Sequence, residues 1–281
     1  MIADALGFEF FQRALVAGLL ASVACGIVGT LVLVRKIASI SGGLAHASFG
    51  GIGLGYLAGF PPMAGALLFG LGSALGIGLA ELRLRQGLDT LIAMIWAVGM
   101  ALGITLASLA PGPTPDLLSY LFGNILFVPP LYLWLTASLD VLLVFLVRIW
   151  YRQLRAVAFD EEFSRVIGLP VERLFLVLLG LTAVTVVVLI RVVGVILVIA
   201  LLTIPAAIAR HWARDLAAMM TLAGLSGAIC ICAGLFLSYG VSTLLHVDVP
   251  TGPFIILLAA AVYGLSALAS ALLRERRSAE A

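Results

Sequence analysis

His46 is the side chain with the clearest capacity for chemistry, because it lies among glycines in an otherwise apolar stretch, SGGLAHASFGG at 41–51. Ionisable groups at membrane depth are costly and tend to mark a pathway or a partner. Imidazole binds zinc, manganese and iron at neutral pH, so a metal pathway is one reason to retain it. The other is a structural histidine that hydrogen-bonds a neighbouring helix. The Gly42 and Gly43 pair before it favours an unwound helix start whose backbone groups line a cavity.

A second candidate for cation binding lies in SYGVSTLLHVDVPTGPF at 238–254. His246 and Asp248 are two residues apart, which places both side chains on one face of an extended segment and suits transient capture of a cation. Asp248 can equally cap the turn that the following prolines and glycine impose. The predicted metal pathway therefore comprises His46, His246 and Asp248, with a structural role for Asp248 as the alternative.

Two further acids lie in or beside apolar segments. Asp89 is followed by Thr90 at the start of such a segment, and we expect it to be a helix N-cap. Asp140 lies inside another and requires a cavity or a partner, which the sequence does not identify.

The sequence lacks the motifs of an ATPase or a hydrolase. A phosphate-binding G-x-x-x-x-G-K-[ST] loop needs a lysine after a glycine, whereas the only lysine, Lys36, follows an arginine. No G-x-S-x-G, H-E-x-x-H or zinc-finger cysteine spacing is present. Cys25, Cys230 and Cys232 lie inside apolar runs and are interpreted as packing residues. We expect no enzyme activity in this chain, so ATP hydrolysis would come from a partner subunit.

The composition is that of an integral membrane protein. Of the 281 residues, 63% are apolar and 11% charged, and the mean hydropathy is +1.22, well above the values typical of soluble domains. The formal net charge is only +2. Because the basic residues form short clusters between apolar segments, a nucleic-acid partner is not expected. We expect a single transmembrane domain over residues 1–281, with membrane lipid around it.

The hydropathy pattern predicts an all-α polytopic bundle of eight or nine transmembrane helices, each needing about 20 apolar residues. The second and seventh segments are the weakest, and eight spans result if one of them is re-entrant. Residues 116–128 are too short to cross and are predicted to form a re-entrant or interfacial helix. The nine segments are 10–34, 43–59, 62–80, 89–110, 130–150, 173–190, 192–210, 214–238 and 253–273.

Charge distribution orients these segments, since cytoplasmic loops carry an excess of Lys and Arg. With the N-terminus outside and nine crossings, 14 of the 16 basic residues fall in inside loops or at the inner ends of the spans, and only Arg13 and Arg191 do not. The C-terminus is then inside. Dropping one span would reverse every later loop, so the charge pattern favours an odd number of crossings.

The longest inside loop, residues 151–172, contains a short amphipathic segment, DEEFSRVIG. Asp160 is a plausible N-cap, Phe163, Val166 and Ile167 share one helical face, and Gly168 ends the helix. Such a helix can dock a soluble partner. The alternative, a solvated connector, would not need the apolar face.

Six stretches in this order resemble one family, the membrane permease subunits of ABC importers for zinc, manganese and iron. The resemblance implies a homodimer around a central pathway in the cytoplasmic (inner) membrane, with two cytoplasmic ATP-binding subunits and an extracytoplasmic metal-binding protein. It implies alternating access and a transported divalent metal ion, with no permanently bound cofactor. The stretches are SGGLAHASFGGIGLGYLAG at 41–59, DTLIAMIWAVGMALGITLAS at 89–108, DLLSYLFGNIL at 116–126, FDEEFSRVIGLPV at 159–171, VVGVILVIALLTIPAAIAR at 192–210 and DVPTGPFIILL at 248–258.

The resemblance also assigns roles to residues. It makes 160–170 the coupling helix in a groove of the ATPase, and it places His46 in the family motif G-D-x-x-S/A-H-A. This chain has Gly42 where that motif has aspartate. Without that carboxylate, the site would bind a divalent ion more weakly, use another acid or serve a different substrate. The implied coupling residues are Asp160, Glu161, Glu162, Phe163, Arg165, Val166 and Gly168.

An ion-gradient-driven secondary transporter is the alternative function. It should show inverted repeats and paired intramembrane acids. The sequence shows no clear internal repeat and few such acids.

Overall fold

The computed structural model describes residues 6–84, 87–111, 118–123, 125–247 and 249–280, and their regular structure is entirely helical. Each of the nine predicted segments coincides with a long helix. The long helices are α2 (Glu9–Val34), α3 (Ser39–Ala58), α4 (Pro62–Leu84), α5 (Leu88–Ser108), α7 (Pro130–Phe159), α9 (Val171–Val193), α10 (Val195–Trp212), α11 (Leu216–Leu245) and α12 (Thr251–Glu280). The short elements are α6 (Leu118–Phe122), the 3-10 helix η1 (Ile125–Phe127) and α8 (Glu161–Val166).

Eight helices of the described chain are long and apolar enough to cross a membrane. The ninth long helix, α3, has 20 residues, but its glycines, serines and histidine lower its hydropathy. Nearly all of its first 17 residues are nevertheless buried by neighbouring helices. The predicted polytopic helical bundle is confirmed.

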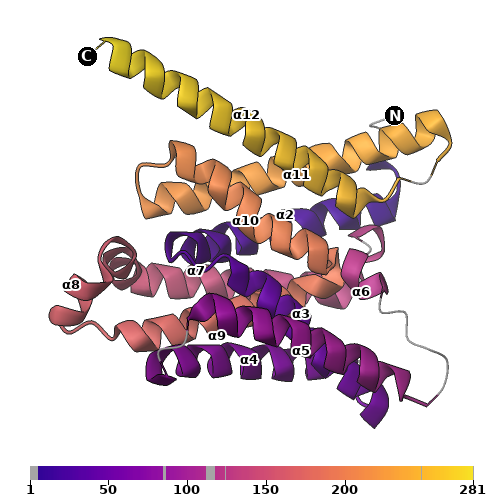
Figure 1. Ribbon diagram of the computed structural model, residues 1–281. Coiled ribbons are helices and arrows are strands. Elements are labelled where there is room, and N and C mark those ends of the chain that lie inside the picture. Colours follow the sequence, from indigo (N-terminus) through magenta and orange to yellow (C-terminus); the bar gives the residue numbers. More distant parts are fainter. Residues whose placement is uncertain (1–5, 85–86, 112–117, 124, 248, 281) are drawn as a thin grey trace.

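The long helices run side by side, and the two ends of the bundle carry different short elements (Figure 1). The helix α8 and the end of α12 lie at one end, whereas α6 and the start of α2 lie at the other. We call these the α8 end and the α6 end. The chain therefore begins and finishes at opposite ends of the bundle, as an odd number of crossings requires.

Burial separates central from peripheral helices. In α2, 72% of the most apolar 18-residue window is buried, compared with 11% in α12. The windows of α5 and α7 are each only 22% buried. The described chain thus leaves α5, α7 and α12 with large uncovered apolar faces, which lipid or another protein must cover.

Glycines bring α3 into backbone contact with both of its main neighbours. A Cβ on Gly51 would overlap the Gly65 carbonyl of α4, and one on Gly53 would overlap the Gly103 carbonyl of α5. Small residues allow this close approach of membrane helices.

The predicted unwinding of the helix at Gly42 and Gly43 is wrong, because α3 is continuous from Ser39 and both glycines are buried within it. They are needed for packing: a Cβ on Gly43 would lie 2.7 Å from Ile92 Cγ2.

The described part of the predicted re-entrant segment forms α6 and η1, neither of which is long enough to cross. Between them, Gly123 has a left-handed backbone, with φ of 64°. Its missing side chain allows direct backbone contact with Gly194, the residue that joins α9 to α10. This contact joins the end of α6 to the connection between α9 and α10.

Candidate metal pathway and coupling site

His46 lies on α3 and stacks against Trp96 of α5. The ring centroids are 4.5 Å apart and the rings are 13° from parallel. The imidazole is half-buried, and its Nδ1 is buried with no hydrogen-bond partner in the described part of the chain. Within the described residues, Nδ1 therefore does not make the hydrogen bond to a neighbouring helix that a purely structural histidine would make. Nδ1 therefore has an unused hydrogen-bonding position at a buried place beside the indole.

Gly42 lies one helical turn before His46 and faces the same tryptophan. A Cβ at position 42 would lie 3.0 Å from Trp96 Cζ3, which is tighter than ordinary van der Waals contact. The indole therefore takes up the space into which a side chain at position 42 would project. A carboxylate could enter only if that ring moved. Trp96 was not singled out in the sequence, because no local pattern connects it with a histidine 50 positions earlier.

The other predicted pathway residues are not assembled around His46. His246 is exposed at the C-terminal end of α11, in a left-handed conformation with φ of 54°. It is therefore not in the extended segment that the spacing argument assumed. Asp248 lies outside the described residues. Among the residues that are described, no group of three or more His, Cys, Asp or Glu side chains could hold a metal ion.

The two other acids differ in their surroundings. Asp89 accepts a hydrogen bond from the Ser39 hydroxyl, at 3.1 Å, and so joins the starts of α3 and α5. The N-cap of α5 is Gly87, so the N-cap expectation for Asp89 is wrong: the helix begins two residues earlier and the carboxylate bonds another helix. Asp140 is buried on α7, and neither carboxylate oxygen has a hydrogen-bond partner within the described residues.

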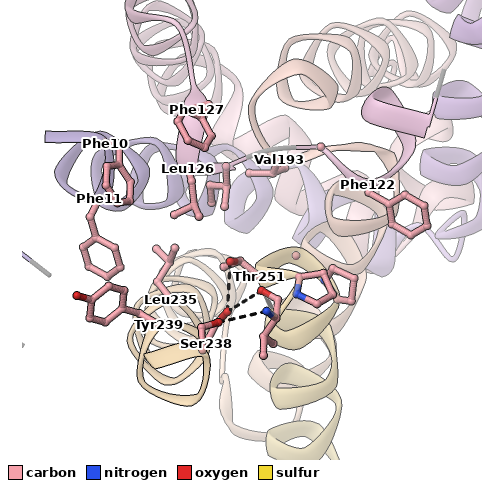
Figure 2. Close-up of a pocket in the computed structure, with 17 residues that line it drawn as sticks. Phe10, Phe11, Phe122, Leu126, Phe127, Val193, Leu235, Ser238, Tyr239 and Thr251 are labelled. Atoms are coloured by element: carbon pink, nitrogen blue, oxygen red, sulfur yellow. Dashed lines mark hydrogen bonds between the residues drawn. The ribbon is translucent and has the colours of Figure 1, made fainter. Parts of the chain in front are cut away.

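A hollow of about 580 Å³ lies at the α6 end (Figure 2). Aromatic side chains of α2, α6, η1 and α11 surround it, including Phe11 and Tyr239. Its polar part is a hydroxyl cluster in which Ser238 Oγ lies 3.3 Å from both Thr251 Oγ1 and the Val249 carbonyl oxygen. Its described lining contains no carboxylate, imidazole or thiol.

At the opposite end of the bundle, the six-residue helix α8 is capped at both of its ends. The Asp160 carboxylate accepts a hydrogen bond from the Phe163 amide at 2.9 Å, as expected for an N-cap. Gly168 follows the helix with φ of 82°, and the Leu169 amide donates to the Ser164 carbonyl at 3.0 Å. This pattern is a Schellman motif, in which glycine provides the left-handed residue. Both predicted ends of the helix are confirmed.

The two faces of α8 have opposite surroundings. Ser164 is fully buried against the bundle, and its hydroxyl donates to the Asp160 carbonyl at 2.6 Å. The predicted apolar face points away from the protein, since Phe163 is 59% exposed and Val166 84%. Ile167 is also exposed. The described chain thus leaves this apolar face without a covering partner.

Glu161 is directed toward the bundle and pairs with two arginines. Its Oε2 lies 3.2 Å from Arg35 Nη1, and its Oε1 lies 3.2 Å from Arg165 Nη2. The Arg35 guanidinium also stacks over Phe175 of α9, 5.5 Å from the ring centroid. Burial lowers the pKa of Arg35 and the Glu161 carboxylate raises it, and the guanidinium stays charged at neutral pH. No local pattern predicted the pairing of Arg35 with Glu161, because 126 positions separate the two residues.

Comparison with known proteins places these features in a family. The chain is 44% identical over 263 residues to an uncharacterized membrane protein of Synechocystis sp., covering 94% of this chain and 92% of that one. It is 30% identical over 261 residues to the manganese transport system membrane protein MntC of Halalkalibacterium halodurans, covering 93% and 87%. A solved structure, PsaBC from Streptococcus pneumoniae in complex with Fab, matches with a TM-score of 0.82 at 31% identity, covering 95% of both chains. The model of the ABC 3 transport family matches residues 7–270, and the chain therefore belongs to this family.

Proposed function

We propose that this chain is the permease subunit of an ABC importer that carries a divalent transition metal across the cytoplasmic membrane. Membership of the ABC 3 transport family supports the class of transporter. Relatives named as manganese transport proteins, which align over most of this chain, favour manganese over zinc or iron. In this proposal the ion is the cargo of the transporter and not a permanently bound cofactor.

The observation that carries this proposal is the uncovered apolar face of α8. A six-residue helix capped at both ends, with Phe163 and Val166 largely exposed, is unfavourable in water unless a partner covers it. Burying each of these side chains is worth about 1.5–3 kcal/mol. We infer that a separate cytoplasmic ATPase binds this face, with Asp160 and Gly168 fixing the helix and Glu162 at its edge. The α8 end then faces the cytoplasm, as does the C-terminus.

We place the ion pathway beside His46 and Trp96. The face of α5 that carries the indole is partly open, since Trp96 is itself 42% exposed. A second copy of the chain packed across this face would bring two imidazoles to one central pathway. A site of neutral ligands holds a cation weakly, and weak binding allows the ion to leave again. His246 and Asp248 remain proposed contacts at the α6 end, where an extracytoplasmic metal-binding protein would deliver the ion.

The proposed cycle is alternating access. Closure of the ATPase dimer on ATP would move the two α8 helices together, and the helices joined to them would open one end of the pathway while closing the other. This chain supplies the pathway and the contact with the ATPase, within a single domain over residues 1–281. The energy comes from the partner.

The test is reconstitution of the purified chain with its ATPase in proteoliposomes, followed by measurement of Mn²⁺ uptake with and without ATP. We expect uptake to require both ATP and the ATPase. Val166→Asp should abolish co-purification of the ATPase, because it places a charge in the apolar contact. The matched control, Val247→Asp, changes an exposed valine at the α6 end and should leave association intact. Uptake driven by an ion gradient without any ATPase would instead establish a secondary transporter.

A further inference from the structure

We propose that Arg35 is the residue through which α8 moves α3, so that docking and transmission use different faces of the same short helix. This inference rests on the proposed function, because it concerns how the motion of an ATPase would reach the pathway. It assigns the apolar face of α8 to the partner and the inward-facing carboxylate of Glu161 to the bundle.

The ion pair with Arg35 is the better sheltered of the two that Glu161 makes. The side chain of Arg35 is 14% exposed, whereas that of Arg165 is 58% exposed. Exposed ion pairs contribute little, because solvent screens them. A sheltered pair is costly to break, since it leaves a charge without its partner. Arg165 belongs to α8 and moves with Glu161, so displacement of α8 should act on the bundle through Arg35.

Both the side chain and the backbone of Arg35 are fixed to the rest of the bundle. Its guanidinium lies over the buried ring of Phe175, and its backbone caps the C-terminus of α2. Lys36 then takes a left-handed conformation with φ of 58°, and the Ile37 amide donates to the Val32 carbonyl at 3.1 Å. This is a second Schellman turn, and it holds the short connection between α2 and α3 in one geometry.

That connection leads directly into the helix of the pathway. The first residue of α3, Ser39, follows Arg35 by four positions, and His46 lies about 10 Å further along the helix axis. Ser39 also donates its hydrogen bond to Asp89 of α5, the helix that carries Trp96. A shift of Arg35 therefore acts on the start of both helices whose side chains form the His46 and Trp96 stack.

A second carboxylate that lines a hollow of about 370 Å³ beside Arg35 provides a control for Glu161. The lining of this hollow includes Glu161 and also Glu172, at the first turn of α9. Glu172 makes no ion pair in the described part of the chain. Glu172→Gln thus removes a carboxylate from the same hollow without removing a contact of Arg35.

The experiment is a double-mutant cycle in proteoliposomes with the ATPase bound, using Arg35→Gln, Glu161→Gln, the double variant and the Glu172→Gln control. The readouts are co-purification of the ATPase and Mn²⁺ taken up per ATP hydrolysed. We expect both single variants to bind the ATPase normally and to lose about fivefold or more of Mn²⁺ per ATP. The double variant should be no worse than either single one, because both changes break the same contact. Glu172→Gln should behave as the wild type.

Two results would overturn the inference. One is that both single variants keep the wild-type ratio of Mn²⁺ taken up to ATP hydrolysed. The other is that the single variants lose binding of the ATPase, which would make the Arg35–Glu161 pair part of the docking surface. If Arg35→Gln fails to fold, Glu161→Gln decides alone, because its side chain is 43% exposed. Failure of the wild-type chain to bind any ATPase would refute the proposed function itself, and that result is distinct from either of these.

Discussion

α3 and α8 are held in the molecule by opposite means. In α3, glycine backbones touch the backbones of α4 and α5. In α8, side chains fix the position instead: the cap from Asp160 and the pair between Glu161 and Arg35 attach a helix that buries only Ser164. α3 therefore tolerates little added volume, whereas α8 depends on a few polar groups.

The largest effect expected from this difference is at the contact of α3 with α4. Gly65→Ala should lower the free energy of unfolding by about 3 kcal/mol, because the added Cβ overlaps the Gly51 carbonyl and neither backbone can yield. The measurement is the thermal midpoint in detergent, together with the monodisperse fraction. Gly72→Ala is the matched control on the same helix, where a Cβ meets nothing within 4 Å. Equal midpoints for the two variants would show that the backbone contact is unimportant.

The next largest effect concerns the ion pathway. His46→Ala should reduce Mn²⁺ uptake on the order of tenfold, a size typical when a metal site loses one supporting group. Folded yield should fall less, because the change removes the ring contacts with Trp96 and Phe49, worth about 1 kcal/mol. His211→Ala, at the α8 end of α10, removes another histidine and serves as the control. Equal losses of uptake and folded yield would identify His46 as a packing residue.

A smaller effect is expected at the cap of α8. Asp160→Ala should weaken binding of the ATPase about fivefold, since the lost N-cap costs about 1 kcal/mol of a six-residue helix. Thermal stability of the bundle should not change, because α8 contributes little to the core. Asp160→Asn retains a capping oxygen and should bind nearly as the wild type does. A titration of the ATPase against the immobilised permease measures both, and identical affinity of the alanine variant would rule out this role of the cap.

The smallest effect is expected at the cysteines. Cys230 is buried and Cys232 half-buried on α11, both as free thiols. Alanine at either position should cost about 1 kcal/mol of stability and leave Mn²⁺ uptake intact. A large loss of uptake in a folded variant would contradict their interpretation as packing residues.

Much of the architecture was accessible from local sequence patterns. The long apolar segments predicted the helices, and Asp160 and Gly168 predicted both ends of α8, because these signals act between residues close in the chain. The prediction of an unwound helix start at Gly42 was wrong, because the conformation there depends on contacts with another helix. Glycine favours both flexibility and close packing, and only the presence of Trp96 and Ile92 on a neighbouring helix decides between them.

The side chains around the candidate site depended on contacts that no local pattern encodes. Arg35 and Glu161, Ser39 and Asp89, and His46 and Trp96 are each separated by 50 or more positions. Each pair meets because two helices cross at one place. The same limit applied to His246, whose left-handed backbone depends on how α11 ends and α12 begins.

The sequence by itself determined that the chain is a membrane-embedded helical bundle with a short amphipathic helix, since hydropathy, charge bias and caps act along the chain. Only the tertiary structure decided that an indole covers His46 on the side of Gly42, and that Glu161 faces the bundle while Phe163 and Val166 face away. These outcomes depend on the position and rotation of packed helices. Those are fixed by the close approach of small residues far apart in sequence.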